Sequence, residues 1–399
     1  MAELSTSPQA RRSILGLGAA AFLALALGGC QLVPKPRSEP IPEQAPPQAE
    51  PEEEVRGPNL PPDETRNRVA VLVPLSGANS GVGTSIANAA NLALLDAGGD
   101  RIRITVYDTA KSGAAAAANQ ALAEGNGLFL GPLLADDVRA VAPIARRADV
   151  PVISFSNDAS VAGDGVYLMG FTPAQSVGRV VAFAAERDAQ RFGAITPVNV
   201  YGRRASQAML DAVGRADARL EGVQTFDAGP GALRTAIVRL SALGALDAVL
   251  IADSGRVAAV AAPILKTGAE ANVRILGTEL WATESALGRT PALRGAWYAA
   301  VSDTMFNQLR TRYKSRYGTT PYRLASLGYD SVLLAVRIAK GWRLGRPFPE
   351  RELRDPGGFA GIDGAFRFTG NGVAERSLEV REVTATGTIV VSPAPKSFD

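Results

Sequence analysis

The fold of this chain is decided by the stretch Val69-Ala70-Val71-Leu72-Val73-Pro74-Leu75-Ser76-Gly77. Its first five residues are apolar and rich in β-branched side chains, and a Pro/Ser/Gly boundary ends the run. A short apolar run of this kind is typical of a strand buried on both faces of a parallel sheet. Residues 85–97 follow with the composition of a helix, and the pair Gly98-Gly99 predicts its end.

Apolar runs and helical segments alternate after this first strand. Strands are predicted at 103–107, 128–131, 150–154, 192–196, 222–226, 247–251 and 274–277, and helices at 114–124, 136–147, 203–213, 232–243 and 256–267. Alternation at this spacing predicts right-handed βαβ units and an α/β fold with doubly wound parallel sheets.

The C-terminal part adds two helices and a meander. Helices are predicted at 303–317 and 326–342, and strands at 364–368, 378–383 and 388–391, with a Gly-Asn-Gly turn after the first of these strands. The folded part, about 330 residues, is too long for one hydrophobic core. Two lobes are therefore expected.

The N-terminus has the pattern of an export signal. Arg11 and Arg12 precede an apolar run that ends in Leu27-Gly28-Gly29-Cys30, and Cys30 is the only cysteine. The ending resembles the lipobox of bacterial lipoproteins, which implies a signal peptide at 1–29 and acylation of Cys30. An ordinary secretory signal is the alternative, and the Arg pair leaves both general and twin-arginine export open. Gln31, in place of Asp, implies sorting to the periplasmic face of the outer membrane.

Residues 30–67 are rich in Pro, Glu and Gln. Such a composition buries too little apolar surface to fold, so this segment is predicted to be a lipidated, disordered tether. A lipid anchor at Cys30 would attach the folded body to the membrane surface.

Composition excludes several classes of chemistry. Histidine is absent, so Ser-His-Asp catalysis and His-ligated zinc are excluded. The net charge is only +3, and no clustered basic face indicates a nucleic-acid partner. No disulfide is possible with one cysteine. The sequence indicates no catalytic residue, metal site or cofactor, and the protein is not expected to be an enzyme.

Ordered motifs resemble the type I periplasmic binding proteins of the branched-chain amino-acid class. The similar residues are 71–77, Gly83, 107–109, Gly131-Pro132, 151–154, Tyr201-Gly202, 246–249 and 361–364. The resemblance implies two Rossmann-like lobes with parallel sheets, joined by three crossovers around a ligand cleft. It places the first lobe at 68–172 and 302–360, the second at 173–301 and 361–392, and a tail at 393–399.

Two segments resemble a narrower group. Residues 106–109 and 130–134, followed by Asp136-Asp137 and Val138, are similar to the LpoA-type lipoproteins. Those proteins activate class A penicillin-binding proteins in peptidoglycan synthesis. The lipobox, Gln31 and the long tether agree with that setting.

The resemblance also implies the position of a ligand cleft. Amino-acid binders of this class hold the ligand carboxylate with hydroxyls and backbone N–H groups of the first lobe, and the ammonium with an acid of the second. The candidate cleft residues are Ser76, Gly77, Leu133, Ser154, Ser156 and Asp158 in the first lobe, and Tyr201, Asp253 and Glu279 in the second. Asp158 stands where a Thr is expected, and an anionic side chain there repels a carboxylate.

Other polar motifs have simpler interpretations. Asp136-Asp137 is expected to cap or begin a helix rather than to bind a metal. The Gly77, Gly81, Gly83 spacing lacks the Lys-Ser/Thr of a phosphate loop and indicates a strand-to-helix turn. Trp281 and Trp297 are expected in the core, and the basic run from Arg310 to Arg316 on a solvated helix face.

The sequence thus favours a non-enzymatic outer-membrane lipoprotein that activates a class A penicillin-binding protein. The main alternative is a solute-binding lipoprotein that delivers an amino acid or small amide to an ABC transporter. A ligand sensor for another envelope protein also remains open, and a carboxylate-based hydrolase is the least favoured class.

Overall fold

The computed structural model describes residues 63, 65–267, 272–395 and 398. The predicted signal peptide, the lipidation site Cys30 and nearly all of the tether lie outside the described residues. Along the described part, no helix has both the length and the apolar character needed to cross a membrane.

The first lobe is built on a parallel sheet whose strands follow the order β2-β1-β3-β4-β5. These strands are β1 (Asn67–Val73), β2 (Ile102–Asp108), β3 (Phe129–Leu130), β4 (Val152–Ser154) and β5 (Val166–Leu168). The connecting helices are α1 (Ser80–Asp96), α2 (Ala114–Ala123) and α3 (Ala135–Arg147). Val69, Val71 and Val73 point into the core on one face, and Ala70 and Leu72 into the core on the other. Both faces are covered, which explains why the run at 69–73 is apolar throughout.

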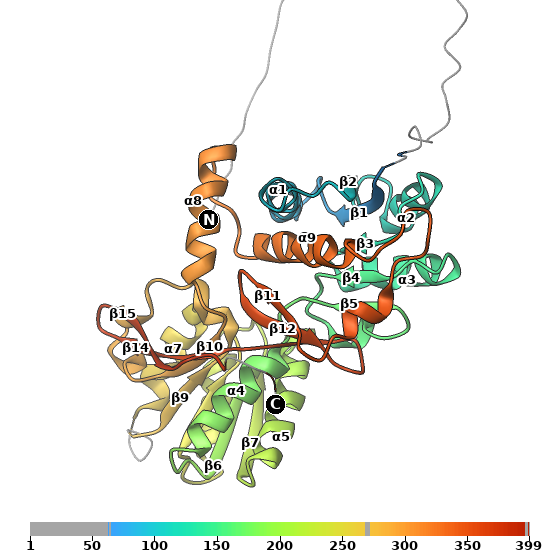
Figure 1. Cartoon of the computed structure of the whole chain (residues 1–399). Helices are drawn as coiled ribbons and strands as arrows, with labels where there is room; N and C mark the ends of the chain where they lie inside the picture. The colour runs from blue at the N-terminus through green and yellow to red at the C-terminus, as the bar shows by residue number, and fades with distance from the viewer. Residues whose placement is uncertain (1–62, 64, 268–271, 396–397, 399) are drawn as a thin grey trace, which may run out of the picture. The chain divides into compact units, whose positions relative to one another are not determined.

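The second lobe contains a mixed sheet with the order β15-β14-β10-β9-β8-β6-β7. Its strands are β6 (Arg191–Pro197), β7 (Arg219–Phe226), β8 (Ala248–Ile251), β9 (Arg274–Gly277), β10 (Trp297–Ala300), β14 (Glu379–Thr384) and β15 (Gly387–Ser392). The covering helices are α4 (Pro173–Ala185), α5 (Val200–Arg215), α6 (Ala232–Ser241) and α7 (Gly255–Leu265). Only β14 and β15 run antiparallel to their neighbours among the described strands of this sheet. Separate apolar cores lie on its two faces, one against α4 and α5 and the other against α6 and α7. Figure 1 shows the strands and helices of this lobe below those of the first lobe.

Later segments return to the first lobe. They are α8 (Thr304–Tyr317), α9 (Ala325–Ala339) and a small antiparallel sheet of β11 (Phe359–Gly361), β12 (Gly364–Phe368) and β13 (Ala374–Arg376). Short 3-10 turns lie at Ala159–Val161, Glu279–Thr283, Leu287–Arg289, Pro291–Leu293 and Glu350–Arg354. Helix α9 packs beside α1, and both contribute to the same core.

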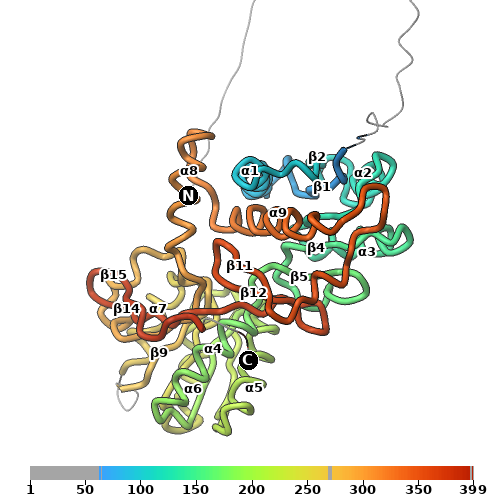
Figure 2. Tube along the Cα trace, viewed as in Figure 1, coloured from blue at the N-terminus to red at the C-terminus, as the bar shows by residue number. Residues whose placement is uncertain are grey.

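The chain passes between the lobes in three places within the described residues, after β5, after β10 and after β13, as Figure 2 shows. The third boundary of the lobes differs from the sequence-based assignment. Ile362, Phe366 and Phe368 lie in the core of the first lobe. The small sheet therefore packs with the first lobe, and the change to the second lobe falls near Ser377 rather than at residue 361, because the aromatic side chains of β12 are buried there.

Charged side chains tie these crossovers together. Arg376 donates to the carbonyl of Met169, and Arg381 donates to the Asp303 carboxylate at 2.6 Å and to the Val301 carbonyl at 3.0 Å. Arg323 forms an ion pair with Asp363, with 2.7 Å between Nη2 and Oδ1. Since Met169, Val301 and Asp303 belong to crossing segments, the network links these segments to one another at the junction of the lobes.

Candidate functional site

The carboxyl ends of the parallel strands of the two lobes carry the residues predicted to line the cleft. In the first lobe, Ser76 and Gly77 follow β1 and are exposed. The hydroxyl of Ser76 donates to Asp108 at 2.8 Å. Gly77 has a φ of +72°, which favours glycine, and a Cβ at Gly83 would lie 1.8 Å from the carbonyl oxygen of Pro74. This geometry is the strand-to-helix turn that the glycine spacing predicts.

The loop after β4 uses its own hydroxyls. The Ser154 hydroxyl donates to the carbonyl of Pro132 at 3.1 Å and accepts from the amide of Ser156 at 3.1 Å. The Ser156 hydroxyl accepts from the amide of Asp158 at 3.1 Å. Both serines are buried, with 0% and 2% of their surface exposed. Their hydroxyls therefore hold the loop in place rather than face a ligand.

Both carboxylate oxygens of Asp158 have hydrogen-bond or ion-pair partners. One carboxylate oxygen accepts from the Ser160 amide and hydroxyl at 3.0 and 2.8 Å, and the other accepts from Arg139 at 2.9 Å. Arg204 of α5, in the second lobe, approaches Asp158 to 3.1 Å. Burial by itself raises the pKa of Asp158, but the Ser160 hydrogen bonds and the two arginines outweigh it, so the pKa lies below its usual range.

The sequence also singles out Leu133, Asp136 and Asp137 in the first lobe. Leu133 is partly buried and packs against the first-lobe core. Asp136 and Asp137 occupy the first turn of α3, where negative charge stabilises a helix, although Leu134 holds the cap position and no side chain caps this end. The described residues contain no group of three or more acidic, His or Cys side chains arranged to hold a metal.

The second lobe brings Tyr201 and Glu279 together. Asn199 caps α5 by accepting from the Gly202 amide at 2.8 Å, which sets Tyr201 in the first turn. The Tyr201 hydroxyl lies 2.9 Å from both Glu279 Oε1 and Thr278 Oγ1. Ser176 of α4 donates to the second carboxylate oxygen of Glu279. These four side chains, Ser176, Tyr201, Thr278 and Glu279, form what we call the Glu279 cluster.

Burial dominates the electrostatics of this cluster. It raises the pKa of Glu279, although hydrogen bonds from Ser176 and Tyr201 act in the opposite direction. Burial and the nearby Glu279 carboxylate raise the pKa of Tyr201 far above its usual value, so this side chain is a neutral hydrogen-bond donor. No ion pair to Glu279 occurs among the residues that the structure describes.

Asp253, the remaining candidate, has a structural role. Its carboxylate accepts from the amide of Ser254 at 2.6 Å, and its carbonyl accepts from the Trp281 indole at 3.0 Å. Trp281 and Trp297 are both buried, as the sequence predicts. The basic run on α8 lies on an exposed helix face, where Arg312 pairs with Asp96 at 2.7 Å.

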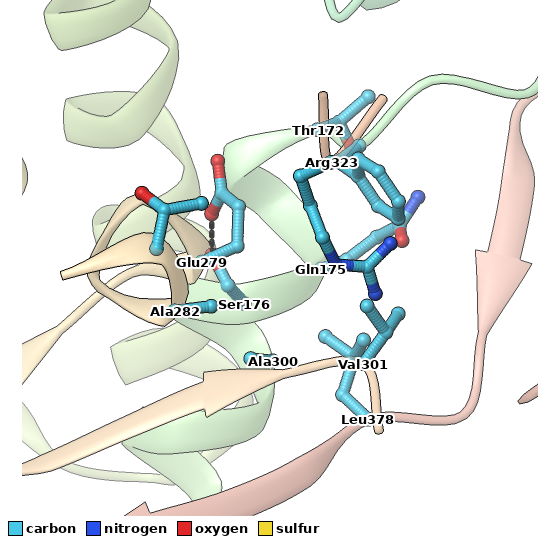
Figure 3. A pocket seen from close by; sticks show the side chains of 11 residues that line it. Thr172, Gln175, Ser176, Glu279, Ala282, Ala300, Val301, Arg323 and Leu378 are labelled. Carbon is cyan, nitrogen blue, oxygen red and sulfur yellow. Dashed lines mark hydrogen bonds between the residues drawn. The ribbon is translucent and has the colours of Figure 1, made fainter. Parts of the chain in front are cut away.

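A pocket lies beside the Glu279 cluster, and its empty space of about 410 Å³ includes open solvent. In Figure 3, Glu279 and Ser176 face each other on one side, and Arg323 lies on the other side near Val301 and Leu378. The walls are formed by the start of α4, the crossovers and the turn after Glu279, and the lining residues are Phe171, Thr172, Gln175, Ser176, Glu279, Ala282, Thr283, Ala300, Val301, Arg323 and Leu378. The hydroxyl of Thr172 is buried here without a hydrogen-bond partner.

Sequence reasoning missed several of these residues. Thr172, Gln175 and Ser176 belong to the start of α4, which was not predicted. The pair Thr172-Pro173 before a run with helical spacing is a start signal that would have located this helix. Arg139 and Arg204 gave no such signal, because their partner Asp158 is brought to them only by the tertiary structure.

Comparison with known proteins agrees with this architecture. A family model described as periplasmic binding protein matches residues 67–388. The chain therefore belongs to the periplasmic binding protein family, and its α/β fold is the type I form that the sequence predicts.

Solved structures of transport proteins share the fold. The leucine-binding protein LivK of Thermotoga maritima is 21% identical, with a TM-score of 0.60 and coverage of 82% of this chain and 98% of that one. A putative branched-chain amino acid ABC transporter protein of Rhodospirillum rubrum is 19% identical, with a TM-score of 0.71 and coverage of 82% and 100%. A solute-binding protein of R. palustris in complex with benzoate is 17% identical, with a TM-score of 0.60 and coverage of 83% and 97%. At these identities the likeness concerns the fold alone.

A curated relative adds little about activity. It is an uncharacterized protein of Rickettsia prowazekii, 24% identical over 174 residues, or 43% of this chain. The match spans about half the length of that relative, 47%.

Proposed function

We propose that this protein is a periplasmic solute-binding lipoprotein, anchored through Cys30, that holds a small solute beside Glu279 and presents it to an ABC transporter of the inner membrane. Family membership and the transport proteins that share its fold support this class. Transfer from an outer-membrane anchor would need the reach of the Pro/Glu-rich segment at 30–67.

The observation that carries the proposal is the Glu279 cluster and its pocket. An acidic side chain that accepts hydrogen bonds from the hydroxyls of Ser176 and Tyr201 lies next to a largely apolar hollow at the junction of the lobes. A concave apolar site with a few convergent polar groups is the usual form of a small-molecule site. Bending at the crossovers would let the lobes close on a bound solute.

The test is a thermal-shift screen of the full mature protein. Amino acids, amides, amines and aromatic acids are each added at saturating concentration. A true ligand at about 100 times its Kd stabilises the native state by about 2.7 kcal/mol, and the shift disappears in Glu279→Ala. If no member of the panel raises the melting temperature, the transport proposal fails.

The second candidate is activation of a class A penicillin-binding protein. It is favoured by one observation: the position where an amino-acid binder holds a carboxylate carries Asp158, already paired with Arg139 and Arg204. A cleft bridged in this way by its own side chains suits a docking domain. Affinity capture of the lipidated protein from envelopes tests it, and recovery of a penicillin-binding protein at moderate salt is the expected result.

The two candidates respond differently to Asp158→Thr. This change removes the anion and restores a hydroxyl to the expected carboxylate site. In the transport account, an amino acid then binds more tightly, and any capture of a penicillin-binding protein seen with the wild type is unchanged. In the docking account, that capture is lost.

A further inference from the structure

Glu279 has no cationic side chain as an ion-pair partner among the residues that the structure describes. Its carboxylate is contacted by the hydroxyls of Ser176 and Tyr201, and no Lys or Arg forms an ion pair with it among the described residues. Burial disfavours the charged form of this group. A ligand ammonium would restore the missing charge partner, and the hydroxyls already hold the carboxylate in place to receive it.

The pocket next to Glu279 is mainly apolar. Phe171, Ala282, Val301 and Leu378 line it together with Ala300. Its polar wall includes the buried Thr172 hydroxyl, which has no partner and lines this pocket. A ligand here needs an apolar body of a few carbons, because the burial of methylene groups against this lining favours binding.

Among the described residues that line the pocket, no cation is left to hold the carboxylate of a ligand. Arg323 lines the pocket, but it forms ion pairs with Asp363 at 2.7 Å and Asp303 at 3.6 Å and donates to Ser326 at 3.0 Å. Asp158 places a negative charge at the first-lobe position where amino-acid binders hold the ligand acid. The Ser154 and Ser156 hydroxyls are both used within their own loop.

We propose that the solute is a small apolar monoamine without a carboxylate, with its ammonium on Glu279 and its tail in the pocket lined by Phe171, Val301 and Leu378. This inference rests on the proposed transport function and names the substrate class of the same site. Discrimination against amino acids then comes from Arg323, the guanidinium in this lining, whose charge is already paired with Asp363 and Asp303. The Thr172 hydroxyl could donate one hydrogen bond to the acid of a zwitterion, which would leave most of the acceptor sites of that carboxylate unpaired.

The experiment compares 3-methylbutylamine with leucine, which is the same amine with one carboxylate added. Binding of each to the full mature protein is measured by isothermal titration calorimetry at neutral pH. We expect the amine to bind at least about tenfold more tightly than leucine, because leucine must bury a carboxylate that lacks its full set of partners. 3-Methylbutanol, which has the tail without the charge, should bind at least about tenfold more weakly than the amine.

Two variants locate the site. Glu279→Gln keeps the shape of the side chain, and it should weaken the amine about tenfold or more. Glu284→Gln is the matched control. It removes a nearby carboxylate that pairs with Arg256 at 3.5 Å and does not line the pocket, so amine affinity should stay within about twofold of wild type. Circular dichroism of both variants confirms that they fold.

Each outcome is decisive. Tighter binding of leucine than of the amine overturns the monoamine class and leaves the solute-binding function standing. Amine binding that Glu279→Gln does not weaken overturns the placement of the ammonium. Failure of 3-methylbutylamine to bind overturns the inference, and failure of the whole thermal-shift panel as well overturns the transport function.

Discussion

The two walls of the cleft place their acidic groups in opposite situations. On the first-lobe wall, Asp158 receives hydrogen bonds from Ser160 and charge from two arginines, and its pKa is lowered. On the second-lobe wall, Glu279 has hydroxyl partners, and burial raises its pKa. The Asp158 carboxylate has cationic partners within the protein, whereas Glu279 forms no ion pair among the residues that the structure describes. A strand end that resembles a family's binding loop therefore need not retain its capacity to bind a ligand.

The largest effect on stability is expected from replacing Asp158, whose carboxylate is paired with two arginines. Asp158→Ala should lower the free energy of unfolding by about 1–3 kcal/mol, because a buried group with several charged hydrogen bonds is lost. Asp136→Ala is the matched control, since Asp136 pairs with the same Arg139 at 2.7 Å but its side chain is 96% exposed. It should change stability by less than about 0.5 kcal/mol. Urea denaturation at pH 7 measures both.

The pH dependence sharpens this prediction. Because the pKa of Asp158 is lowered in the folded state, its contribution is present above the unfolded pKa of about 3.9 and is lost as pH falls through the folded value. The difference between wild type and Asp158→Ala should therefore shrink below about pH 4. A difference that stayed constant down to acid would show that Asp158 acts by packing rather than by charge.

For Glu279, stability should change with pH in the opposite direction. A raised folded-state pKa means that the folded protein binds this proton more tightly, so stability falls as pH rises above the unfolded pKa of about 4.3. Glu279→Gln removes that loss and should stabilise the empty protein at pH 7 by about 1 kcal/mol. The gain should vanish near pH 4. Equal or lower stability of Glu279→Gln at pH 7 would mean that the carboxylate has a cation partner after all.

A smaller effect on amine affinity than that of Glu279→Gln is expected at Tyr201. Tyr201→Phe removes a hydroxyl that lies 2.9 Å from both Thr278 and Glu279. Stability should fall by about 1 kcal/mol, since Glu279 keeps its hydrogen bond from Ser176 but the buried Thr278 hydroxyl loses the hydrogen bond from Tyr201. Affinity for the amine should drop a few-fold, about threefold, because the Glu279 carboxylate loses one donor. An increase in amine affinity would show that the ring, not the hydroxyl, shapes the site.

Much of the fold was readable from local patterns. Continuous apolar runs such as 69–73 and 248–251 located central strands, because strands buried on both faces carry no polar residues. Strands β5 and β10 were missed, because the segments 166–168 and 297–300 do not form a run rich in β-branched side chains such as 69–73. Helix α1 begins at Ser80 rather than at Ser85, because small residues in its first turn look like a loop.

The site was predicted less completely than the fold. Tyr201 and Glu279 were named from their places after strands, and they do meet, although the expected roles of Ser154 and Ser156 as ligand-facing groups do not agree with their internal hydrogen bonds. The contacts of Asp158 with Arg204 and of Ser176 with Glu279 join segments far apart in sequence. Such pairs depend on how helices pack at the junction of the lobes, which no local pattern encodes.

A crystal structure of the protein grown with 3-methylbutylamine and leucine together tests the central claim most directly. The account predicts the amine in the pocket, with its nitrogen about 3 Å from a carboxylate oxygen of Glu279. Leucine held between the lobes with its acid group next to residue 158 would contradict it.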